Sequence, residues 1–185
     1  TEDSVDTIVM TWVKKETGRN WRGDASTLTD EVVIRATQEL EIGGLLIEWM
    51  MKVNASLKWN ELAIASVKHG NLPILRLLKR TERLENPNTM KTDVDGMKLI
   101  HIATMWNQWR VLKWLVDHCG ASVDVTNGEG QTVIHVAASK GHLEMIKLLE
   151  SEYGVEVLSG KDNRNRTLVH IASMNGHVEI LEWLW

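Results

Sequence analysis

The fold of this protein is decided by residues 130–149, which read GQTVIHVAASKGHLEMIKLL. Apolar residues at i, i+3 and i+4 mark one face of a first helix, and they are Ile134, Ala137 and Ala138. Thr132 is suited to cap the start of that helix, and Gly141 is suited to the left-handed position that ends it. The inward face of a second helix is marked by Leu143, Ile146 and Leu149. The stretch therefore predicts two short helices joined by a tight turn.

The same pattern recurs on both sides of this stretch. KLIHIAT begins at Lys98, 34 residues before Thr132, and TLVHIAS begins at Thr167, 35 residues after it. The Gly-His pair at residues 141–142 recurs at residues 176–177. A layer of two short helices cannot cover its own apolar faces, so it must stack on copies of itself. The sequence therefore predicts a stack of helical layers.

A period near 34 residues with a Thr-x-x-His-x-Ala core resembles the ankyrin repeat. The family usually has Thr-Pro-Leu-His, and here the proline is replaced by Leu99, Val133 and Leu168. The resemblance implies an all-α ankyrin-repeat solenoid of helix-turn-helix layers with extended turn tips. We expect about five repeats, preceded by an N-terminal half-repeat or a helical cap.

The apolar pattern of the outer helices divides the chain into segments. The clear repeats are 91–123, 124–158 and 159–185, and the last ends with its outer helix. Residues 54–90 form an eroded repeat with Ile64 in place of the histidine. Residues 1–53 read either as degenerate ankyrin repeat sequence or as a helical cap of other ancestry.

Composition limits the class of protein. The chain has 185 residues, 43% of them apolar, and a net charge of -4. That charge argues against a nucleic-acid partner, although Arg76, Lys79, Arg80 and Arg83 form one basic stripe. No apolar run is long enough to span a membrane. The single cysteine, Cys119, rules out an internal disulfide and indicates an intracellular, reducing compartment. Because the chain lacks an initial Met and stops inside a helical pattern, we expect a fragment of a longer protein.

No group of residues indicates catalysis. His101, His135 and His170 occur once per repeat, too far apart to share a metal ion. We interpret them as buried side chains that bond to the backbone. Cys119 follows His118 directly, and neighbours on a helix do not face each other. We find no phosphate-binding loop or nucleophile motif. The sequence therefore predicts a non-enzymatic protein with no cofactor and no metal.

The resemblance implies that a partner protein binds the concave face, which is built by the turn tips and by two positions that end each inner helix. The corresponding residues are Asp95, Met97, Glu129, Gln131, Arg164 and Arg166 at the tips, and Lys68, His69, Met105, Trp106, Ser139, Lys140, Met174 and Asn175 on the helices. We expect Trp106 to dominate affinity, because exposed tryptophans are favoured at binding hot spots. In contrast, Trp109, Trp114 and Leu148 are expected in the core.

These observations predict a protein–protein interaction module or scaffold that is monomeric without its partner. Nucleic-acid binding through the basic stripe is one alternative, against which the net charge argues, and two others remain open at this point. One is a regulatory ankyrin segment of a larger enzyme or channel. The other is a pathogen effector that captures a host protein.

Overall fold

A computed structural model describes residues 11, 14–15, 59–90, 92, 95–154 and 158–185. These residues form eight helices and no strand. They belong to two compact units, and the boundary between the units in the sequence lies between Leu84 and Glu85. The prediction of an all-α fold is confirmed. The predicted half-repeat or cap in residues 1–53 lies outside the described residues, apart from positions 11, 14 and 15.

The described helices of the first unit are α4 (Trp59–Lys68) and α5 (Leu72–Arg80). The start of α5 is capped by Asn71, whose side-chain oxygen accepts a hydrogen bond from the Ile74 N–H at 3.2 Å. The inward face of α5 is buried and consists of Ile74, Leu75, Leu77 and Leu78. Its exposed face carries the predicted basic residues, Arg76, Lys79 and Arg80.

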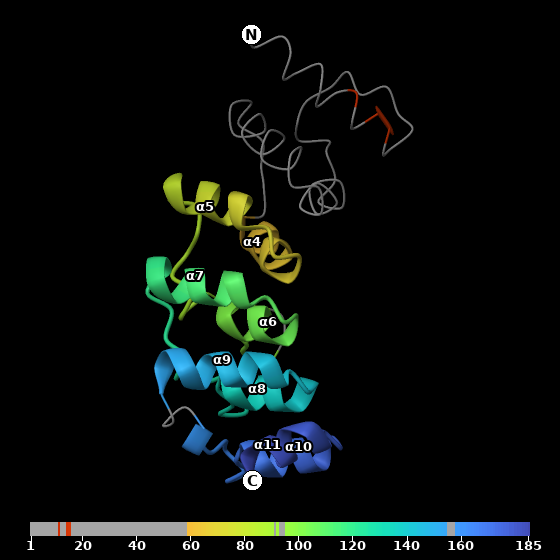
Figure 1. The fold of residues 1–185 in the computed structure, drawn as a ribbon. Helices are drawn as coiled ribbons and strands as arrows, with labels where there is room; N and C mark the ends of the chain where they lie inside the picture. Colours follow the sequence, from red (N-terminus) through yellow and green to blue (C-terminus); the bar gives the residue numbers. More distant parts are fainter. Residues whose placement is uncertain (1–10, 12–13, 16–58, 91, 93–94, 155–157) are drawn as a thin grey trace. The chain divides into compact units, whose positions relative to one another are not determined.

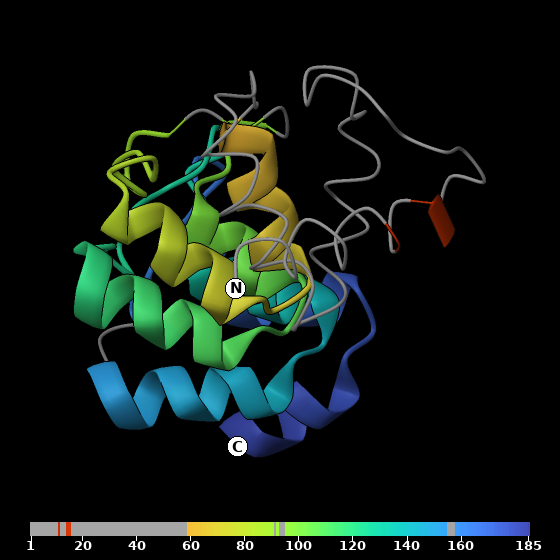
Figure 2. The ribbon, with the colours of Figure 1, turned by 90° about the horizontal axis from the view of Figure 1, so that it is seen from above.

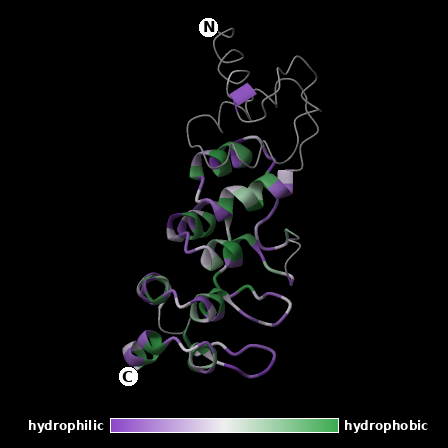
Figure 3. Cartoon of the chain, turned by 90° about the vertical axis from the view of Figure 1, so that its right-hand side faces the viewer, coloured by the Kyte–Doolittle hydropathy of each residue, from purple (hydrophilic) through white to green (hydrophobic). Residues whose placement is uncertain are grey.

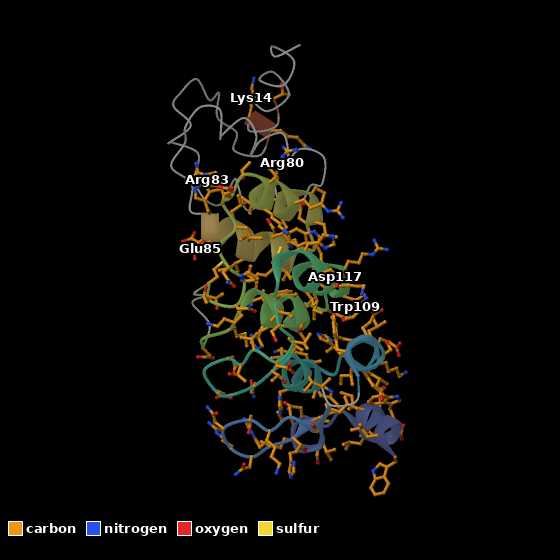
Figure 4. The ribbon with its side chains drawn as sticks, turned by 90° about the vertical axis from the view of Figure 1, so that its left-hand side faces the viewer. Lys14, Arg80, Arg83, Glu85, Trp109 and Asp117 are labelled. Atoms are coloured by element: carbon orange, nitrogen blue, oxygen red, sulfur yellow. The ribbon has the colours of Figure 1, made fainter. Side chains whose placement is uncertain are left out.

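The basic stripe continues from Arg80, the last residue of α5, to Arg83 beyond the helix, and Figure 4 labels both residues. The guanidinium carbon of Arg83 lies 5.1 Å from the centre of the Trp59 ring. This is within the range of a cation–π contact. Part of the predicted stripe therefore helps to hold its own unit together.

The second unit is built from three successive helix pairs, α6 (Leu99–Met105) with α7 (Trp109–Cys119), α8 (Val133–Lys140) with α9 (Leu143–Tyr153), and α10 (Leu168–Met174) with α11 (Val178–Leu184). The two helices of each pair pack on each other, and α8 packs between α6 and α10 (Figures 1 and 2). Each pair forms one layer, as the repeated sequence predicts.

The segment at residues 85–90 also belongs to the second unit, although the sequence pattern places it in the repeat at 54–90. The side chain of Asn88 donates to the Gly120 carbonyl at 2.8 Å and accepts from the Ser122 N–H at 3.0 Å. These two bonds tie the segment to the exit of α7.

The core of the second unit lies between the layers. Every residue of α8 from Val133 to Ala138 is buried, because the flanking layers and α9 enclose that helix. Figure 3 shows hydrophobic colours on the helices and mainly hydrophilic colours on the loops beside them. In α10 the residue equivalent to Ile134 is Val169, which is exposed.

The prediction of the outer-helix core is wrong at three positions. Leu143 and Leu148 are partly exposed, and Met145 is buried instead. Trp109, labelled in Figure 4 at the start of α7, is also partly exposed. Helical periodicity identifies a face to within one residue, and the packing of the neighbouring layer decides which side chain is covered. The predicted burial of Trp114 is confirmed.

Gly141 ends α8 in the left-handed conformation, with φ 72° and ψ 23°. A Cβ at this position would lie 2.6 Å from Nδ1 of His177 in the next layer, whereas a Cβ at Gly176 would meet nothing within 4 Å. Gly176 has almost the same φ, 73°, so it is a matched control.

We predict that Gly141→Ala destabilises the protein more than Gly176→Ala does. Both changes place an alanine in the left-handed backbone conformation, which costs about 1–2 kcal/mol of stability. Gly141→Ala also displaces the His177 ring and its hydrogen bond, adding about 1 kcal/mol. Urea unfolding measures both variants. When His177 is also changed to Ala, Gly141→Ala should destabilise the protein no more than Gly176→Ala does. A larger loss of stability in Gly141→Ala that persists there would contradict a clash with the His177 ring.

Candidate functional site

The turn tips of the second unit are held by one side chain each. Oδ1 of Asn127 accepts from the N–H groups of Glu129 and Gln131 at 3.0 and 2.9 Å. In the next layer, Oδ1 of Asp162 accepts from the N–H groups of Arg164 and Arg166, both at 2.9 Å. The two tips therefore have the same backbone shape, although their exposed side chains differ.

Neighbouring tips are joined to each other through their backbones. The Gly128 N–H donates to the Asp95 carbonyl at 2.8 Å, and the Asn163 N–H donates to the Glu129 carbonyl at 3.0 Å. Each tip is thus fixed to the one before it. The side chains at the tips are presented from a rigid base.

An ion-pair network crosses the last two tips. Nε of Arg166 lies 2.6 Å from Oδ2 of Asp162, and its Nη2 lies 3.5 Å from Oε2 of Glu129. Nη2 of Arg164 lies 3.8 Å from Oε1 of Glu129. Burial alone would raise the pKa of Asp162, but the hydrogen bonds from Arg166 and Arg164 outweigh it and lower that pKa.

Two of the three repeated histidines, His101 and His135, are buried and structural, as predicted, whereas the prediction of burial is wrong for His170, which is exposed. Nδ1 of His101 accepts the Lys98 N–H at 3.0 Å, so Nε2 carries the proton and donates to the Gln131 carbonyl at 3.0 Å. His135 accepts the Thr132 N–H in the same way, at 3.2 Å. Burial lowers the pKa of His101 to about 4 and also lowers the pKa of His135. Each of these rings joins its helix start to the next layer.

A second pair of histidines joins the ends of the inner helices. Nε2 of His142 lies 3.1 Å from the Met105 carbonyl, and Nε2 of His177 lies 3.1 Å from the Ser139 carbonyl. A carbonyl only accepts, so each Nε2 donates. These bonds place the last residues of α6 beside the start of α9, and those of α8 beside the start of α11.

The ends of the inner helices therefore form one row across three layers. We call it the inner-helix row, and it comprises Met105, Trp106, Ser139, Lys140, Met174 and Asn175. Trp106 is 52% exposed and Met174 is 69% exposed, while Lys140 is exposed between them. After Trp106 the chain turns at Asn107, with φ 54° in place of the glycine found at position 141. Asn tolerates this conformation better than most residues do.

The structure separates the predicted binding residues into available and engaged side chains. Met97 is buried, with 9% exposure, so its assignment to a binding surface is wrong. The side chain of Arg166 is only 18% exposed because of its ion pairs, whereas that of Arg164 is 68% exposed. Gln131 accepts a hydrogen bond from the Asn127 side chain at 3.1 Å. Met97, Gln131 and Arg166 therefore belong mainly to the tips' internal structure.

The remaining predicted residues lie in different places. Asp95 and Glu129 are exposed at their tips. The Ser139 hydroxyl donates to the Val136 carbonyl at 2.9 Å, and the Asn175 side chain donates to the Ile171 carbonyl at 2.8 Å. Lys68 ends α4 and His69 follows it, so both belong to the first unit.

Sequence reasoning missed the bracing of the tips. Asn127 and Asp162 occupy equivalent positions 35 residues apart, and that recurrence of a short polar side chain was the available signal. No signal in the sequence indicates that Arg166 rather than Arg164 folds back on Asp162.

The part of the chain that the structure describes contains neither a metal-binding cluster nor a membrane-spanning helix. No cluster of three or more His, Cys, Asp or Glu side chains there is arranged to hold a metal ion. None of the described helices is long and apolar enough to cross a membrane.

The stacked layers, the tips that hydrogen-bond to one another and the repeated histidines define a helical repeat protein of the solenoid class. The family model for ankyrin repeats in three copies matches residues 110–185. Residues 110–185 therefore carry ankyrin repeats. Ankyrin repeats are generally protein–protein interaction modules, and proteins of the family are typically non-catalytic.

Two curated mouse proteins are similar to the chain. Synphilin-1 is 33% identical over 96 residues, which are 50% of this chain and 10% of that protein. Rabankyrin-5 is 36% identical over 70 residues, which are 38% of this chain and 6% of that protein. The chain therefore spans a tenth or less of the length of these relatives.

Proposed function

We propose that this protein is a non-catalytic binding module that takes a partner protein on the concave side of its second unit. The observation that carries the proposal is Trp106, which is 52% exposed at the end of an inner helix. Large aromatic side chains on a surface contribute strongly to binding when a partner covers them. Met105 is partly exposed beside it and widens the apolar contact.

The rigidity of the surface supports the same function. The bonds from His142 and His177 and the bonds between tips hold the row and the tips before a partner arrives. A preordered surface loses little conformational entropy on binding. We assign specificity mainly to Asp95, Lys140 and Arg164, which are charged, exposed side chains of the tips and of the inner-helix row.

Trp106→Ala tests this function. We expect the variant to keep its helicity and melting temperature but to lose a protein that the wild type retains from cell lysate. Trp185→Ala is the matched control, because Trp185 is 104% exposed and lies outside the row. A partner lost only with Trp106→Ala supports the proposal. Equal retention by both variants, or a melted Trp106→Ala protein, would overturn it.

A further inference from the structure

We propose that the inner-helix row binds an amphipathic α-helix of the partner, which lies along the stack with an acidic side chain against Lys140. Apolar side chains one layer to either side would contact Trp106 and Met174. This inference rests on the proposed function and specifies the chemistry of the partner.

The row alternates in character from layer to layer. It has a large apolar pair, Met105 and Trp106, then a small residue and a cation, Ser139 and Lys140, and then Met174. The small side chain of Ser139 leaves room in the middle layer. The middle layer is therefore the place where a partner can bring a side chain close to the ammonium group.

Lys140 is available for an ion pair. It is exposed, and no ion pair involves it within the described part of the chain. Two acidic groups of its own layer, Glu129 and Glu144, pair with other cations. Glu129 faces Arg164 and Arg166, and Glu144 lies 2.8 Å from Lys147. A partner carboxylate would thus meet an uncompensated positive charge.

The spacing of the layers favours a helix over an extended segment. Packed helices lie about 8–10 Å apart, so the row repeats at about that interval. Seven residues of an α-helix rise about 10.5 Å in about two turns, which returns a side chain to the same face. An extended segment covers about 10 Å in three residues, which turns the side chain to the opposite face. A partner helix with contacts about seven residues apart therefore matches the row.

Peptide display tests this chemistry. A displayed library of peptides of about 21 residues, three heptads, is selected on the wild-type protein. It is selected in parallel on Trp106→Ala, Lys140→Glu, Lys140→Gln and the control Trp185→Ala. Circular dichroism confirms that each variant is folded, and Lys140→Gln keeps the test valid if the charge reversal unfolds α8.

We expect wild-type selections to yield amphipathic helices with two apolar residues flanking Glu or Asp at heptad spacing. The affinity for such a peptide should fall about thirtyfold or more in Trp106→Ala and about tenfold or more in Lys140→Glu. Trp185→Ala should have no effect. Peptides selected on Lys140→Glu should carry Lys or Arg at the central position in place of the acid. Peptides selected on Lys140→Gln should show no preference for a charged residue at that position.

Other outcomes separate the two proposals. Peptides that need Trp106 but show no heptad pattern, or no acid opposite Lys140, would overturn the helix inference and leave the proposed function standing. Selected peptides that tolerate both Trp106→Ala and Lys140→Glu would overturn both.

Discussion

Acidification from pH 7 to pH 4 is expected to lower the free energy of unfolding by about 3 kcal/mol through His101 alone. The side chain of His101 is fully buried, and burial lowers its pKa from 6.5 to about 4. In the unfolded chain the ring binds a proton near pH 6.5, but in the folded protein it does so only near pH 4. The contribution of the neutral His101 ring to stability is therefore fully present above pH 6.5 and is lost as the pH falls from 6.5 to 4.

The structural reason is the double role of the ring. Nδ1 of His101 accepts the Lys98 N–H, so a proton on Nδ1 breaks the bond that starts α6. The Lys98 ammonium further disfavours the charged ring. The lowered pKa of His135 acts with the same sign in the next layer and adds to the loss.

Urea unfolding at a series of pH values measures the effect, with His101→Gln as the comparison. This variant should be less stable at pH 7, because it loses the ring's packing and its bond to Lys98. Its stability should also change less between pH 6.5 and pH 4. An unchanged slope would show that other groups cause the acid sensitivity.

Leu149→Ala is expected to destabilise the protein by about 2–5 kcal/mol, as the loss of a buried leucine leaves a cavity. Leu149 is fully buried in α9, whereas the neighbouring Leu148 is partly exposed. Leu148→Ala removes the same atoms and should cost less than half as much. The sequence pattern places both leucines in the core, so the difference between them comes from the structure.

Denaturant unfolding of the two variants gives the comparison directly, and helicity at zero denaturant shows whether each is folded. Leu149→Ala should shift the unfolding midpoint strongly, and Leu148→Ala only slightly. Equal shifts would mean that the layer packs differently from the structure.

The inner helices were the most predictable elements. Their start, their length and the glycine that ends α8 follow from local preferences repeated with a constant period. The outer helices were less predictable, as Trp109, Leu143 and Leu148 show. Their exposure depends on how far each layer is offset from its neighbour, which is a property of packing and not of a single helix.

The candidate site shows the same division. The exposure of Trp106 could be predicted because its position ends an inner helix in a repeat whose register was clear. The burial of Met97 could not, because tip residues have no periodic pattern. The difference between Arg164 and Arg166 is set by Asp162 and Glu129, which come from two successive layers.

The sequence by itself determined that short helix pairs repeat at a period near 34 residues and must stack, because no single pair can cover its apolar faces. Tertiary structure alone decided which side chains remain at the surface. It did so through bonds between residues more than 30 positions apart, such as those of His142 with Met105 and His177 with Ser139. The fold is therefore encoded within each repeat, whereas the surface offered to a partner depends on how one repeat sits on the next.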